Sequence, residues 1–252
     1  MAYGIHLRPL VFISVLLVAW QFAASRQPVH LLPDPVQVGG GLVELARRGL
    51  LLKYIVASLF RVTWGFSLAA MIAIPGGLAI GWHRRTEMAL NPLIQLLRPI
   101  SPLAWIPISI LWFGVGDVAA SFLIFLASLL PLTVTAINAV KSIPAVYVNA
   151  GRNFGLSSAG LVYRVLYPAV IPQLIIGLRI TLGIAWLVVV AAEMIAVNSG
   201  LGFLIVDARN AGSRYDLVVA GMVTIGIIGL LLDMSMRSLE GVRSLRWSYS
   251  ED

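Results

Sequence analysis

Three arginines and a glutamate fall inside long apolar runs of this 252-residue chain: Arg61, Arg98, Arg179 and Glu193. A charged side chain within a bilayer is costly, so each position predicts an ion pair, a wet cavity or a contact with a transported ion. Arg179 and Glu193 share one run at a separation of 14 residues. On a helix this spacing places them about 21 Å apart, so the two cannot pair directly.

Arg179 lies nearer the expected inner half of its run, and Glu193 nearer the outer half. A cation in a solute path suits an anionic substrate, although a structural ion pair is the favoured use of Arg179. A carboxylate repels anions, so Glu193 is expected to hold the external loop, and both residues stay candidates for the path. Asp233 and Arg237 are four residues apart with the acid first, which predicts an anchoring i,i+4 pair.

A proline-rich run over about 92–113 has the pattern of a broken membrane span. Each of its three inner prolines, Pro99, Pro102 and Pro107, removes a backbone donor. Freed carbonyls are tolerated at membrane depth where they are buried in protein or line a wet cavity. Ser101, Pro102 and Trp105 are therefore candidates for lining a translocation path. The alternative is a packing kink without solute contact.

Catalytic constellations are missing from the sequence. The segment Gly76 to Gly81 has the glycines of a phosphate loop, but Trp82 and His83 follow it where lysine and serine or threonine belong. The three histidines are scattered, there are no cysteines, and no triad or paired carboxylates are spaced for hydrolysis. We expect no enzyme activity, no metal site and no cofactor bound by this chain itself.

The composition is that of a membrane protein. Hydrophobic residues make up 59% of the chain and charged ones 12%, against about 25% charged in soluble domains. The net charge of +7 is spread in short clusters between apolar runs, which is typical of orientation signals and not of nucleic-acid binding. The predicted fold class is an all-α membrane protein, residues 1–252 forming one domain with about six spans. These spans cover about 7–24, 58–82, 92–113, 118–140, 171–197 and 217–236.

Basic residues favour a cytoplasmic N-terminus. With the N-terminus inside, nine lie on the cytoplasmic side and six outside. The first run could instead be a cleaved signal peptide, but its basic region is thin and its apolar core long, so a retained span is expected. Residues 41–54 are expected to lie along the membrane surface, with Arg47 and Arg48 reaching the headgroups.

The segment about 141–170 is expected to form a cytoplasmic loop. Residues 146–156 predict a short helix broken at Gly155, which would present Tyr147, Val148, Arg152 and Phe154 to the cytoplasm. Exposed aromatic groups suggest a docking surface for another protein. A connector packed on its own spans is an equally good interpretation.

This segment resembles the EAA loop of binding-protein-dependent ABC importer permeases. That pattern is Glu-Ala-Ala, three residues, Gly, nine residues, Ile, one residue, Leu-Pro. Its positions are filled here by Asn149, Ala150, Gly151, Gly155, Val165, Tyr167 and Pro168. Asn149 replaces the glutamate, so a charge contact at this position is not implied. In the family this loop forms the coupling helix, which sits in a groove of the ATP-hydrolysing subunit.

Further stretches resemble the nitrate/sulfonate/taurine/bicarbonate branch of this family. They are Leu31–Pro35, Leu97–Pro107, Leu111–Gly116, Gly177–Arg179, Ala185-Trp186, Ala192–Met194 and Gly200–Phe203. The resemblance implies a MetI-like type I importer permease in the bacterial cytoplasmic membrane, carrying a small anion by alternating access. It also implies a second permease copy as a homodimer, an external solute-binding protein, and two cytoplasmic ATPase subunits that bind ATP and Mg.

Two rival functions differ in what they require. A secondary transporter driven by an ion gradient would need inverted repeats and ion ligands within the membrane. An enzyme embedded in the membrane would need clustered catalytic residues, and neither set is evident.

Gly77 and Gly81, four residues apart, would permit a close helix contact at a dimer seam.

Overall fold

The computed structural model describes residues 4–26 and 32–240, and within these ranges every regular element is helical. His30, Trp247 and the basic residues of the C-terminal tail lie outside the described residues. The elements are α1 (Gly4–Ser25), α2 (Pro35–Arg47), α3 (Leu50–Trp82), α4 (Arg84–Leu97), the 3₁₀ turn η1 (Pro102–Trp105), α5 (Ile106–Phe113), α6 (Asp117–Lys141), α7 (Ala145–Asn153), α8 (Ser158–Leu161), the π-helical turn η2 (Val162–Leu166), α9 (Tyr167–Ala196), α10 (Leu201–Asn210) and α11 (Tyr215–Glu240).

Four helical stretches are long and apolar enough to cross a membrane: α3, α6, the continuous run Ser158–Ala196, and α11. A fifth candidate consists of α4 followed by η1 and α5, two halves bent by 80° relative to each other. The expected proline-broken span is therefore an elbow, not a single interrupted rod. Helix α1 has 22 residues and contains the apolar stretch Val11–Ser25, and the count of six spans stays a prediction.

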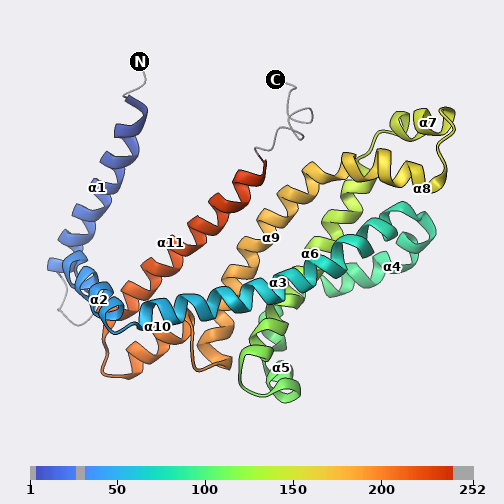
Figure 1. Cartoon of the computed structure of the whole chain (residues 1–252). Coiled ribbons are helices and arrows are strands. Elements are labelled where there is room, and N and C mark those ends of the chain that lie inside the picture. The colour runs from blue at the N-terminus through green and yellow to red at the C-terminus, as the bar shows by residue number, and fades with distance from the viewer. Residues whose placement is uncertain (1–3, 27–31, 241–252) are drawn as a thin grey trace.

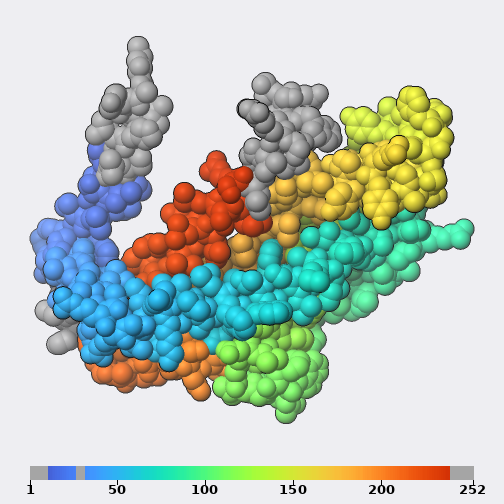
Figure 2. All heavy atoms as spheres, in the orientation of Figure 1, coloured from blue at the N-terminus to red at the C-terminus, as the bar shows by residue number. Residues whose placement is uncertain are grey.

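The two ends of the bundle carry different elements (Figure 1). The start of α1, the end of α11 and α7 lie toward one edge of the view, whereas α2, α5 and α10 lie toward the opposite edge. The start of α1 and helix α7 therefore lie at the same end of the bundle; their side of the membrane stays a prediction. The α7–α8 segment projects as a lobe from the body of the molecule (Figure 2).

Glycines bring α3 and α6 into close contact within the chain. A Cβ added at Gly77 would lie 2.6 Å from the Ala136 Cβ and 2.7 Å from the Thr133 carbonyl oxygen. At Gly81 the nearest atoms would be those of Ile137 and Val140, at about 3.0 Å. The dimer-seam interpretation of Gly77 and Gly81 is therefore wrong for this face, because α6 of the same chain occupies it.

Residues 41–54, which were expected to lie along the membrane surface, are divided between two helices by a glycine. The Asp34 side chain caps α2 by accepting a hydrogen bond from the Gln37 amide, and the Gln37 side-chain oxygen accepts one from the Asp34 amide. Gly49 adopts a left-handed φ of 69° between α2 and α3. Helix α3 then begins at Leu50, eight residues before the expected apolar run. Helix formation thus extends beyond the stretch that hydropathy alone selects.

Candidate functional sites

The predicted coupling segment forms a compact helical hairpin. Helix α7 ends in a turn in which Gly155 donates to the Arg152 carbonyl at 2.9 Å, with a left-handed φ of 76°. Gly151 is buried, because an added Cβ would lie 2.7 Å from Leu161 and 3.3 Å from Val165. The two glycines therefore have different roles: Gly151 permits close packing of α7 on α8, and Gly155 permits the turn between them.

The outer face of this hairpin is apolar and uncovered within the chain. Val146 is 71% exposed, Tyr147 50% and Phe154 86%. Asn149 and Arg152 are exposed beside them, whereas Val148, expected at the surface, is half-buried. Three other residues of the predicted coupling segment differ in solvent exposure. Ala150 and Val165 are half-buried, and Pro168 is exposed at the start of α9.

The elbow of the broken span brings two of the path candidates together. Ser101 caps η1 by accepting a hydrogen bond from the Leu103 amide at 3.3 Å. Pro102 and Trp105 line an apolar recess of about 160 Å³. The other lining residues are Leu97 and Ile100 and, from α6, Leu126, Leu129 and Leu130.

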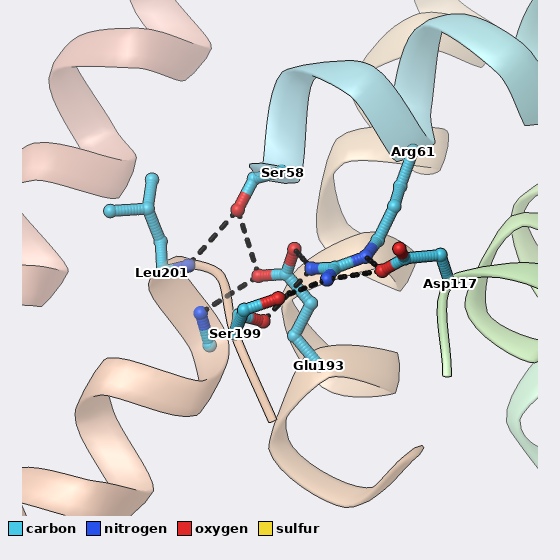
Figure 3. Close-up of polar contacts among 7 residues, drawn as sticks. Ser58, Arg61, Asp117, Glu193, Ser199 and Leu201 are labelled. Atoms are coloured by element: carbon cyan, nitrogen blue, oxygen red, sulfur yellow. Dashed lines mark hydrogen bonds and ion pairs between the residues drawn. The ribbon is translucent and has the colours of Figure 1, made fainter. Parts of the chain in front are cut away.

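Glu193 and Arg61 form a buried ion pair, in which their side chains are 0% and 1% exposed (Figure 3). The Arg61 guanidinium donates to Glu193 Oε1 at 2.6 Å and to Asp117 Oδ1 at 2.6 and 2.8 Å. It also donates to the Ser199 carbonyl oxygen at 2.8 Å and to the Ser199 hydroxyl. One guanidinium thus joins α3 to the start of α6, to α9 and to the turn before α10.

The second Glu193 oxygen holds the same turn. Glu193 Oε2 accepts hydrogen bonds from the Ser58 hydroxyl and the Gly202 amide, both at 2.9 Å. The Ser58 hydroxyl in turn accepts from the Leu201 amide at 3.0 Å. A carboxylate with this set of donors is positioned to stabilise the loop between α9 and α10, the use favoured for Glu193 from its sequence context. Its place in the path stays a prediction.

Sequence reasoning placed Arg61 inside a span but missed this role. Its partners Asp117 and Glu193 are 56 and 132 residues away, so no local spacing rule connects them. The available signal was the charge itself: Arg61 and Glu193 lie in different apolar runs, neither has an opposite charge within reach on its own run, and each therefore requires a partner from elsewhere in the chain.

Arg179 binds Asp233, which corrects the pair expected between Asp233 and Arg237. The Arg179 guanidinium donates to the two Asp233 oxygens at 2.6 and 2.9 Å, joining α9 to α11. No ion pair joins Asp233 to Arg237 among the described residues. Arg179 lies on a neighbouring helix and approaches in bidentate geometry, which is stronger than an exposed pair within one helix.

Comparison with known proteins identifies the family. The family described as "Binding-protein-dependent transport system inner membrane component" matches residues 49–242. The chain is 36% identical over 235 residues to the taurine transport system permease protein TauC of Escherichia coli K12, covering 90% of this chain and 85% of TauC. It is 37% identical over 246 residues to the nitrate import permease protein NrtB of Synechocystis sp. PCC 6803, covering 94% and 88%.

The fold agrees with these relationships. A chain in an inward-facing structure of the MetNI methionine ABC transporter superposes with a TM-score of 0.67. The match covers 76% of this chain and 94% of that one, at 18% sequence identity. The helical arrangement is therefore that of a type I ABC importer permease. Together, the family match and the identities to full-length permeases show that the chain belongs to the family of binding-protein-dependent transport system inner membrane components.

Proposed function

We propose that this chain is the membrane permease of an ATP-driven importer that moves a small anion into the cell. Membership of the permease family supports the transport role. Relatives named for taurine and nitrate support an anionic substrate. The proposed complex contains two permease copies in the bacterial cytoplasmic membrane with their N-termini in the cytoplasm, an external solute-binding protein, and two ATPase subunits that carry ATP and Mg.

The observation that carries the coupling proposal is the α7–α8 hairpin. Its apolar side chains Val146, Tyr147 and Phe154 are exposed, and the segment that carries them projects as a lobe (Figure 2). A contiguous apolar surface of this kind is typical of a protein interface. Tyr147, Asn149, Ala150, Gly151, Arg152, Gly155, Val165 and Pro168 are the residues assigned to this coupling element.

The hairpin is attached to the membrane bundle without a flexible linker. From Ser158 the chain continues through η2 and α9 to Ala196 as one helical run of 39 residues. A displacement of α7 by closing ATPase subunits would thus be passed along α9 to the turn held by Glu193. In this mechanism, nucleotide-driven movement at the cytoplasmic end changes access to the path at the other end.

Copurification with the cognate ATPase tests the proposal. Wild type and the double variant Val146→Ser/Phe154→Ser would be expressed with a tagged ATPase subunit and extracted in mild detergent. Val36→Ser on α2, where the side chain is 78% exposed, is the matched control for loss of an exposed apolar group. We expect wild type and Val36→Ser to retain the ATPase and the double variant to lose it while still inserting into membranes.

The opposite outcomes discriminate between alternatives. If the double variant binds the ATPase as wild type does, the hairpin is not the docking element. If a correctly inserted wild-type chain recovers no ATPase and transport instead follows an ion gradient, the secondary-transporter alternative replaces the importer.

A further inference from the structure

A groove of about 430 Å³ lies between α3 and α6, and the end of α5 closes one part of it. Its walls carry five aromatic side chains: Phe60 and Trp64 on α3, Phe113 on α5, and Phe122 and Phe125 on α6. Among the described residues that line the groove, Asp117 is the one that carries a charge. The groove thus combines a large apolar surface with a single carboxylate.

Asp117 carries a negative charge that its own ion pair does not balance. The Arg61 guanidinium faces two carboxylates, Asp117 and Glu193, and no second cation pairs with either among the described residues. Both hydrogen bonds to Asp117 go to Oδ1 (Figure 3), and no described residue donates to Oδ2. The Asp117 side chain is 62% exposed, so a cation from outside the chain can reach it.

The charged and apolar parts of the groove follow each other along the membrane normal. Helix α6 begins at Asp117 and has 25 residues, so its length is about 36 Å, against about 30 Å for the hydrocarbon core of a bilayer. Asp117 therefore lies near headgroup level, at the end of the bundle that carries α5 and α10 (Figure 1). Phe122 and Phe125 follow five and eight residues later, so the aromatic lining extends about 12 Å along α6 into the hydrocarbon.

We propose that this groove binds one phospholipid with a primary ammonium headgroup, a phosphatidylethanolamine. The ammonium donates a hydrogen bond to Asp117 Oδ2, and one acyl chain lies along the aromatic side chains. The order of the two parts matches a lipid, whose charged head and apolar tail follow each other in the same direction. A charge-assisted hydrogen bond at this boundary is also stronger than in bulk water, because the local dielectric constant is lower.

Other lipid headgroups match the groove less well. The trimethylated nitrogen of choline has no N–H to donate, and an anionic headgroup meets the unbalanced charge of Asp117. Arg61 does not offset this repulsion by binding a lipid phosphate. Its five N–H donors are all bound to Asp117, Glu193 and Ser199, and its side chain is 1% exposed.

Native mass spectrometry of the delipidated full chain in detergent measures this binding. The probes are dioleoyl phosphatidylethanolamine, phosphatidylcholine and phosphatidylglycerol, which share their acyl chains and differ in their headgroups. We expect one tightly bound phosphatidylethanolamine per chain. Its affinity should exceed that of the other two lipids by about tenfold to a hundredfold, the usual effect of a hydrogen bond between charged groups.

Substitutions separate the headgroup contact from the acyl-chain contact. Asp117→Asn keeps an acceptor for Arg61 but removes the charge, so it should lower the affinity for phosphatidylethanolamine to that for phosphatidylcholine; Asp117→Glu should restore part of it. Ser121→Phe adds a ring to the groove lining and should weaken both lipids alike, and Val118→Trp serves if that variant does not insert. Asp207→Asn is the matched control, since Asp207 is an exposed carboxylate of α10 at the same end of the bundle.

Tryptophan fluorescence locates the acyl chain. In phosphatidylcholine vesicles, a minor fraction of phosphatidylethanolamine brominated on its acyl chains should quench Trp64, which the difference between wild type and Trp64→Phe isolates. The same fraction of brominated phosphatidylcholine should quench it less. Asp117→Asn should remove the difference between the two brominated lipids.

The inference is overturned if phosphatidylethanolamine binds no better than phosphatidylcholine, or if Asp117→Asn behaves like Asp207→Asn. It is also overturned if glycerophosphoethanolamine, which lacks acyl chains, competes as well as the whole lipid, because the site then holds a soluble amine. If a second copy of the chain covers the groove instead, wild-type dimers bind no lipid there and Ser121→Phe converts them to monomers. None of these outcomes bears on the proposed transport function, which copurification with the ATPase tests separately.

Discussion

Replacement of Arg61 by methionine should destabilise the permease more than any exposed arginine substitution. Arg61→Met keeps an unbranched side chain in the α3 core but leaves the Glu193 carboxylate buried, with only the Ser58 hydroxyl and the Gly202 amide as donors. Removing one member of a buried ion pair costs about 3–5 kcal/mol, because the remaining charge is uncompensated. At about 2–4 °C per kcal/mol for a domain of this size, the expected loss in Tm is about 6–20 °C.

Thermal unfolding of the detergent-solubilised chain, followed by size-exclusion fluorescence, measures this loss. Arg85→Met is the matched control, since Arg85 is exposed and has no ion-pair partner among the described residues. Asp117→Asn should have a smaller effect than Arg61→Met, because the Asp117 side chain is 62% exposed and exposed pairs contribute about 0–1 kcal/mol.

The double variant Arg61→Met/Glu193→Gln separates charge burial from loss of packing. It should recover part of the Tm lost in Arg61→Met, because no uncompensated carboxylate remains. The reasoning is refuted if Arg61→Met unfolds at the same temperature as Arg85→Met, or if adding Glu193→Gln lowers the Tm further.

Three other perturbations have defined outcomes. Gly77→Ala should cost about 1–3 kcal/mol by overpacking α3 on α6, whereas Gly76→Ala, whose added Cβ meets nothing within 4 Å, should be neutral or slightly stabilising in the same thermal assay. Gly155→Ala should cost about 1–2 kcal/mol through its left-handed φ and should weaken ATPase retention; full retention would argue against a role for this turn. The hydrogen bond from Arg214 lowers the pKa of Glu44 below 4.5, so the ion pair stabilises the fold above pH 4.5 and is lost as the pH falls through the lowered value. The Tm difference between wild type and Glu44→Gln should therefore be constant above pH 4.5 and vanish in stronger acid, and a difference independent of pH would contradict this assignment.

Much of the helical framework could be predicted because the signal is local. The apolar run expected at 118–140 forms α6, Asp117–Lys141, since its length and composition depend on adjacent residues only. The break in the preceding span, 92–113, could be predicted from its prolines, but the 80° bend between its two halves could not. Proline removes a hydrogen bond and permits a bend, whereas the direction and size of the bend depend on the helices packed around it.

The site was less predictable because its contacts join distant segments. Asp233 was assigned to Arg237 by the i,i+4 rule, but Arg179 on α9 provides a better-oriented guanidinium. Gly77 was assigned to a second copy because spacing shows that a close contact is permitted but not which helix makes it. The short α7 helix and its glycine turn, by contrast, are local features and were expected.

The long separation between Arg61 and its partners has a consequence for biogenesis. Arg61 enters the membrane with α3, before either carboxylate has been synthesised, and an arginine in a new span raises the insertion free energy by about 2.5–3.5 kcal/mol. Asp117 follows 56 residues later and Glu193 132 residues later. At about 5–20 residues per second, the first partner arrives after about 3–11 s and the second after about 7–26 s. Asp117 is thus the earliest counter-ion that the nascent chain can offer, and α3 must be held by the insertion machinery or stabilised by lipid headgroups until α6 emerges.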